Sequence, residues 1–166
     1  MRRTIRFSKR MRRWLEMAAY LALAFAMLGV RAAAQGASAS NGQAFVVVVN
    51  ADNPITAIDR DELSRMFLKR VATWPNGSAA EPVDLPAAEP SRIAFSKVVH
   101  KKPVNAVRAF WQQQIFSGRD IPPVEESTEA NVVSWVSTHV GGVGYVSSTL
   151  NLAAGVKIID VQGVKP

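Results

Sequence analysis

The residues best placed for chemistry are Ser91 and Arg92, with Asp84 a few positions earlier in the chain. They lie between a short predicted strand over 82–85 and a predicted helix that begins at Ser91. The first turn of a helix offers unpaired backbone N–H groups and a partial positive charge. A serine hydroxyl and an arginine fork add donors that can hold a tetrahedral oxyanion without a metal. The segment is therefore a candidate oxyanion site. The alternative is that Ser91 only caps its own helix and Arg92 points into water.

Other catalytic or metal-binding patterns are missing from the sequence. Cysteine does not occur, which excludes disulfides, thiolate metal sites and cysteine nucleophiles. The two histidines, His100 and His139, are each predicted at the surface near a helix C-terminus. The sequence holds no G-x-S-x-G elbow, no H-E-x-x-H pair and no Walker loop. We therefore expect no enzyme, no catalytic residue, no metal site and no cofactor.

The positive charge of the chain is concentrated at its start. The formal net charge is +7, and residues 1–34 hold eight basic residues against one acidic residue. Residues 35–166 hold 12 basic and 12 acidic residues and are neutral. A neutral domain offers no basic footprint for nucleic acid, so no nucleic-acid partner is expected.

The first residues have the layout of a secretion signal. A basic stretch over 1–13 precedes an apolar run over 17–30, and small residues follow at 32–34. The apolar run is shorter than the roughly 20 residues that span a bilayer. An uncleaved anchor or a twin-arginine signal is the alternative.

This layout predicts that the chain has three parts. We expect a signal peptide over 1–34, a flexible lead-in over 35–43 and a folded domain over 44–166. The domain would work outside the cytoplasm, in a bacterial periplasm, and would meet the membrane only during export.

The domain is predicted to alternate strands and helices. The run over 44–49 is apolar without alternation, which favours a strand buried on both faces, as in a parallel sheet. Together the elements predict an α/β fold with a mainly parallel sheet flanked by helices, whose ligands lie at the carboxyl ends of strands. Further strands are expected over 82–85, 143–146 and 156–161, and helices over 59–68, from Ser91, over 103–116 and after a Ser127 cap. Asp59 is the predicted cap of the first helix, whose buried stripe is Leu63, Met66 and Phe67, and Gly118 is predicted to follow the helix over 103–116.

Several aromatic and apolar positions are assigned to the core. The spacing along 103–116 places Trp111 and Ile115 on one buried face, and Trp135 belongs to the core of the next helix. Trp74 precedes a Pro-Asn-Gly turn and is predicted to anchor that loop on the domain.

Several motifs together resemble the phosphate-binding proteins of bacterial phosphate ABC transporters. The segment Val46-Val-Val-Val-Asn50 is followed by Asn53-Pro-Ile55, then by Leu63-Ser-Arg-Met-Phe67-Leu68 and Trp74. Val143-Gly144-Tyr145-Val146 resembles the "I-G-Y-V" strand of that family, and the start of the helix at Ser91 resembles its anion-binding helix. The order and spacing of these motifs extend over roughly 44–148.

The resemblance implies one lobe of the type-2 periplasmic-binding-protein fold, with phosphate or a related oxyanion as ligand. Ser91, Arg92 and Asp84 are the implied ligand-binding residues, and an ABC transporter permease is the implied partner. Asp84 stands where the family has an arginine, although a carboxylate can accept a hydrogen bond from a protonated phosphate. The chain is too short for two lobes, so two copies in a homodimer could rebuild a cleft. The alternative is a periplasmic protein-interaction or sensory module that keeps the scaffold without high-affinity anion binding.

Overall fold

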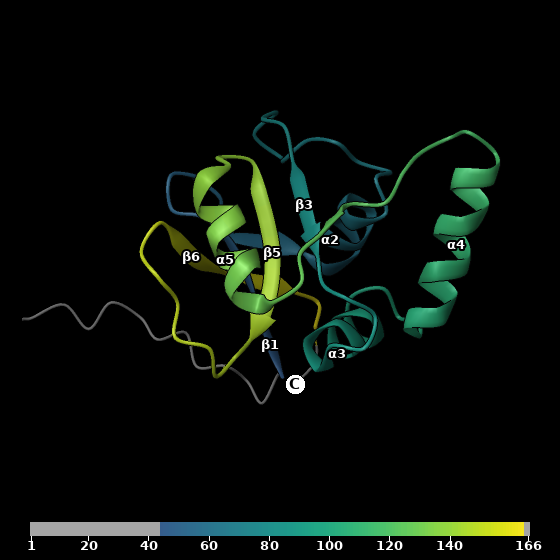
Figure 1. The fold of residues 1–166 in the computed structure, drawn as a ribbon. Helices are drawn as coiled ribbons and strands as arrows, with labels where there is room; N and C mark the ends of the chain where they lie inside the picture. The colour runs from purple at the N-terminus through teal and green to yellow at the C-terminus, as the bar shows by residue number, and fades with distance from the viewer. Residues whose placement is uncertain (1–43, 165–166) are drawn as a thin grey trace, which may run out of the picture. The chain divides into compact units, whose positions relative to one another are not determined.

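The strand β1 (Phe45–Asn50) is the centre of a six-stranded sheet in the computed structural model, which describes residues 44–164. These residues belong to one compact unit. The predicted signal peptide and lead-in lie outside the described residues. All side chains of β1 but one are fully buried, because helices cover both faces of the sheet (Figure 1).

The sheet is mixed, with more parallel than antiparallel pairs. Its strand order is β2-β6-β1-β5-β3-β4. The pairs β2/β6, β3/β5 and β3/β4 are parallel, which confirms the predicted α/β fold with a mainly parallel sheet. However, β1 is antiparallel to both of its neighbours, β5 and β6. The apolar run of β1 predicted burial on two faces, which does not fix the direction of a strand. The other strands are β2 (Ala57–Asp59), β3 (Glu81–Asp84), β4 (Val124–Glu125), β5 (Gly142–Ser147) and β6 (Val156–Gln162).

Successive residues of β5 show which helix covers which face. Gly144 faces α5 (Glu129–Thr138), and a Cβ at this position would lie only 2.5 Å from Val132 Cγ1. Tyr145 faces the other side, where its ring stacks on Phe95 of α3 (Pro90–Val98) with centroids 3.9 Å apart. The sheet is therefore the middle layer between α5 and α3.

Two more helices complete the domain. The helix α2 (Arg60–Phe67) buries Leu63, Met66 and Phe67, as predicted. The helix α4 (Val104–Phe116) lies beside α3 and away from the sheet (Figure 1). No helix within 44–164 is long and apolar enough to cross a membrane.

The prediction that Ile115 is buried is wrong. Ile115 is 51% exposed, because the buried side of α4 ends at Trp111, one turn earlier. Gly118 follows α4 with φ +65°, as its predicted position after the helix requires.

The start of α2 agrees with the sequence prediction, whereas the starts of α3 and α5 differ from it. Asp59 caps α2 by accepting hydrogen bonds from the amides of Asp61 and Glu62, as predicted. The helix α3 starts one residue before Ser91, at Pro90, so Ser91 is not its cap. The cap of α5 is Thr128, not Ser127, because the Thr128 hydroxyl accepts from the Asn131 amide.

The motif residues Asn50 and Asn53 shape the chain after β1. Asn50 Nδ2 donates to the carbonyls of Val136 and Ser137, each at 3.0 Å, and so caps the C-terminus of α5. Asn53 Oδ1 accepts from the Ile55 amide at 3.0 Å, which closes a turn. These asparagines join β1 to its neighbours rather than facing a ligand.

The loop after α2 is held by Trp74. Trp74 is 1% exposed and its Nε1 donates to the Gly141 carbonyl at 3.1 Å. This confirms the prediction that Trp74 anchors its loop on the domain.

Candidate functional site

Asp84 and Arg92 meet at the carboxyl end of β3. Asp84 is the last residue of that strand and Arg92 lies in the first turn of α3. Arg92 Nη1 donates to Asp84 Oδ2, and the Tyr145 hydroxyl donates to Asp84 Oδ1. The Leu85 amide adds a third donor at 2.9 Å. The alternative that Arg92 points into water is wrong, since the residue is only 5% exposed.

Burial dominates the electrostatics of this cluster. Burial raises the pKa of the Asp84 carboxyl, and the Arg92 charge and the Tyr145 hydroxyl oppose that rise. Burial beside the Asp84 carboxylate also raises the pKa of Tyr145, which therefore stays a hydroxyl donor at neutral pH. Arg92 Nε is buried with no partner among the described residues. The guanidinium thus retains donor capacity that Asp84 does not use.

Asp84 and Arg92 line a cavity of about 210 Å³ between β3, α4 and the segment before β4. A second arginine, Arg108, and Gln112 line the same cavity from α4. Apolar walls come from Trp111, Ile115, Pro122 and Pro123, and Glu125 adds an acidic group at the β4 edge. Two guanidinium groups in a small, partly apolar cavity can bind a small anion.

Ser91 is directed elsewhere. Its hydroxyl donates to Glu129 Oε1, and the Ser147 amide donates to the same oxygen at 2.9 Å. Ser91 and Glu129 line a separate cavity of about 510 Å³ with Ser147, Ser148 and Thr149. The structure therefore brings Asp84 and Arg92 together but separates Ser91 from them. The Glu129 carboxylate therefore accepts the hydrogen bond that Ser91 offers at the start of α3.

His100 corrects another expectation. It is 7% exposed rather than at the surface, and its Nδ1 lies 2.9 Å from the Ser64 hydroxyl. Burial, together with the nearby Arg92 charge, lowers the pKa of His100 to about 4. His100 is therefore a neutral core residue at neutral pH. The two valines before it in the chain, Val98 and Val99, give no hint that α2 would cover it.

Three residues of the site were missed by sequence reasoning. Tyr145 is part of a motif in a predicted strand. No motif includes Arg108 or Glu129, and the sequence assigns neither residue to a site. Strand alternation around Gly144 could have placed Tyr145 on the α3 side. No local pattern signals that Arg108 lines the same cavity as Arg92 or that Glu129 contacts Ser91, because the residues of each pair lie in separate elements.

The described residues offer no metal centre. Within 44–164, no group of three histidine, aspartate or glutamate side chains is placed to hold an ion. The donors at the cavity are guanidinium and amide groups, which suit anions.

Comparison with known proteins identifies the fold. No family model and no curated protein sequence matches the chain. Among solved structures, an ABC-type phosphate transport receptor from Vibrio cholerae matches with a TM-score of 0.56 and 17% identity, over 74% of this chain and 48% of that one. A phosphate ABC transporter substrate-binding protein from Clostridium perfringens, solved with bound phosphate, matches with 0.56 and 15%, over 74% and 46%. PstS from Borrelia burgdorferi matches with 0.54 and 11%, over 74% and 49%.

The described domain shares its fold with about half of each of these receptors. This confirms the resemblance that the motifs after β1 and in β5 indicated. The chain spans about half the length of the receptors it matches. In this receptor fold, the cavity at Asp84 and Arg92 and the cavity at Ser91 both open near the start of α3.

Proposed function

We propose that the chain is an exported binding protein of the phosphate-receptor type that takes phosphate or a related oxyanion. Export to the periplasm is supported by the signal layout of residues 1–34. The solved structures that share the fold are receptors and substrate-binding proteins, which supports a binding role rather than catalysis. Delivery of the oxyanion to an ABC transporter permease is part of the same proposal.

The observation that carries this proposal is the pair of arginines that line one cavity. Arg92 lines it with an almost fully buried side chain that Asp84 holds in place. Arg108 supplies a second guanidinium to the same cavity. Asp84 would accept a hydrogen bond from a protonated oxyanion, which favours hydrogen phosphate over sulfate. Ser91 would contribute only after its hydroxyl leaves Glu129.

The proposal predicts selective oxyanion binding to the purified protein. Titration calorimetry with phosphate, sulfate, molybdate and methylphosphonate should show phosphate binding most tightly. Arg108→Gln should weaken phosphate binding by about tenfold or more, since a hydrogen bond to a charged group contributes about 1.5–3 kcal/mol. Arg108 is exposed, so this variant should fold normally.

Arg119→Gln is the matched control, because Arg119 is an exposed arginine just after α4 and does not line the cavity. It should bind phosphate like the unchanged protein. Equal binding by the Arg108 and Arg119 variants would reject the cavity as the site. No binding of any oxyanion would reject the proposed function.

A second candidate is a periplasmic protein-interaction or sensory module. The contact between Ser91 and Glu129 favours it, because the Glu129 carboxylate already accepts from the Ser91 hydroxyl at the start of α3. Under this candidate, phosphate would neither bind nor raise the unfolding temperature, whereas a bound ligand at a hundredfold excess over its Kd adds about 2.7 kcal/mol.

A further inference from the structure

A groove between α3 and α4 combines apolar and cationic groups. The groove has a volume of about 690 Å³ and lies where α3 ends and α4 begins. Its apolar part comes from Ile93, Pro103 and Val104, and its cationic part from Lys97, Lys101 and Lys102. Ile93 is 51% exposed, which is unusual for an isoleucine at the centre of a helix.

The three lysines form no direct ion pair among the described residues. The ion pairs among residues 44–164 are Arg60–Asp61 and Asp84–Arg92, and neither includes a lysine of the groove. No carboxylate lines the groove, and the nearby Asp61 carboxyl, whose pKa the Lys101 charge helps to lower, lies outside it. Since residues 35–166 have no net charge, three lysines around one groove are a local concentration of positive charge.

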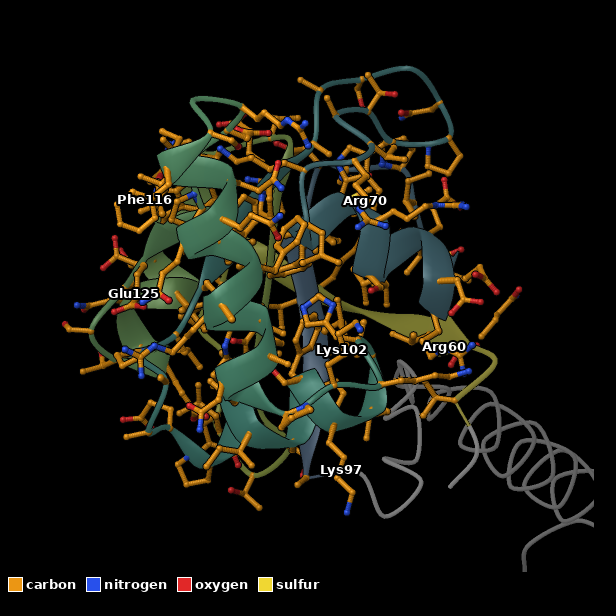
Figure 2. All side chains as sticks on the ribbon, turned by 90° about the vertical axis from the view of Figure 1, so that its right-hand side faces the viewer. Arg60, Arg70, Lys97, Lys102, Phe116 and Glu125 are labelled. Atoms are coloured by element: carbon orange, nitrogen blue, oxygen red, sulfur yellow. The ribbon has the colours of Figure 1, made fainter. Side chains whose placement is uncertain are left out.

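The basic surface continues along α4. Arg70 lies against this helix, with its guanidinium carbon 5.5 Å from the centre of the Phe110 ring. Figure 2 looks onto α4 and shows Arg70, Lys97 and Lys102 on the side that faces the viewer. A partner that follows α4 would meet positive charge along its path.

The shape of the groove selects the kind of occupant. Most of its lining residues are exposed, so it cannot enclose a small molecule as a binding cavity does. It can hold one face of an extended segment whose apolar side chains contact Ile93 and whose carboxylates meet the lysines. We propose that this groove docks an acidic, partly apolar segment of a partner protein. This proposal does not depend on the oxyanion site, which lies on other residues.

The test uses peptides of defined charge and polarity. A fluorescein-labelled peptide of ten alternating Glu and Leu residues should bind the purified protein saturably, as measured by fluorescence anisotropy. A Glu-Ser peptide should bind more weakly because it lacks the apolar contact. A Lys-Leu peptide should not bind. Raising the salt from 0.05 M to 0.5 M should weaken binding, because exposed charges are then screened.

The decisive experiment reverses the charge of single lysines in the groove. Lys97→Glu and Lys102→Glu should each weaken binding of the Glu-Leu peptide by about fivefold or more. Ile93→Ser should weaken it as well. Arg119→Glu, the same change at an exposed site outside the groove, should leave binding within about twofold. All four positions are exposed, so these variants should keep the circular dichroism spectrum of the unchanged protein.

Three results would overturn the proposal. The first is no saturable binding of the Glu-Leu peptide. The second is binding that the groove variants and the Arg119 variant affect equally. The third is binding to phosphatidylglycerol vesicles without binding to the peptide, which would assign the basic surface to a membrane. Phosphate titration of the same variants keeps this test separate from the oxyanion site, because none of them changes Arg92 or Arg108.

Discussion

At the scale of single residues, the core around Tyr145 holds an unusual number of polar groups. Asp84 and Arg92 pair there, His100 contacts Ser64, and Ser96 Oγ is buried without a partner among the described residues. The rings of Phe67 and Phe95 pack against His100, and Phe95 stacks on Tyr145. Buried polar groups of this kind make stability depend on pH, because burial changes the pKa values.

His100 should make the protein less stable in acid. Its pKa is about 4 in the folded protein and near 6.5 in the unfolded chain. Between these values the unfolded chain binds a proton that the folded protein does not, so the free energy of unfolding falls as the pH falls from 6.5 to 4. The expected loss is about 3 kcal/mol. Urea unfolding over a pH series measures it.

Two variants separate this effect from other titrations. His100→Gln should show a clearly smaller loss of stability between pH 6.5 and pH 4, because no imidazole is then buried. His139→Gln at the end of α5 leaves His100 in place and should retain the loss that His100 causes. An unchanged pH dependence in the His100 variant would show that carboxylates, and not this histidine, control the acid transition.

At the scale of elements, the close approach of α5 to β5 fixes this helix on one face of the sheet. Gly144 makes this approach possible, since a Cβ there would lie 2.5 Å from Val132 Cγ1 and 3.0 Å from Val83 Cγ1. The Asn50 amide fixes the other end of α5 to β1. The position of α5 matters for the site because Glu129, at its start, contacts Ser91.

Gly144→Ala should destabilise the protein by about 1–3 kcal/mol, because the added methyl group overpacks the interface between β5 and α5. Denaturant unfolding measures the loss. Val132→Ala in the same chain should restore part of it by making room for the methyl group. The two changes would then be non-additive, as expected for residues in contact. Strictly additive losses would contradict the proposed clash.

At the scale of the whole molecule, the described domain leaves apolar side chains exposed at the far end of α4 and at β4. Phe116 is 90% exposed, Ile121 66% and Val124 52%. Figure 2 shows Phe116 at the edge of the molecule, well away from Lys97. Exposed apolar groups beside an edge strand are typical of an interface with another protein.

We expect a second copy of the chain to cover this surface, which would also bring two lobes together. Light scattering of the purified protein should give twice the mass of one chain. Phe116→Asp should shift it to a single mass, and Arg119→Gln nearby should not. A monomer in every case would rule out the homodimer and leave the surface to a different partner.

Much of the fold could be predicted from local sequence. The apolar run at 44–49, the cap at Asp59 and the glycine after α4 each have a physical effect within a few residues, so their patterns are readable. Predictions failed where an effect depends on residues that are distant in the sequence. The direction of β1 depends on β5 and β6, about a hundred residues later. The burial of His100 depends on α2, and the exposure of Ile115 depends on where α4 loses contact with α3.

The sequence by itself determined the residue types at the start of α3 and the alternation of strands and helices. Both follow from local chemistry, namely helix ends that attract anions and apolar patterns that match helix or strand periodicity. Only the tertiary structure decided how those residues are used. It paired Arg92 with Asp84, turned Ser91 toward Glu129 and placed Arg108 at the cavity. Asp84 and Arg92 are only eight residues apart, but Tyr145 and Glu129, which complete these contacts, are 38 or more residues away from their partners. The packing of the sheet and its helices creates these contacts, and no local pattern encodes them.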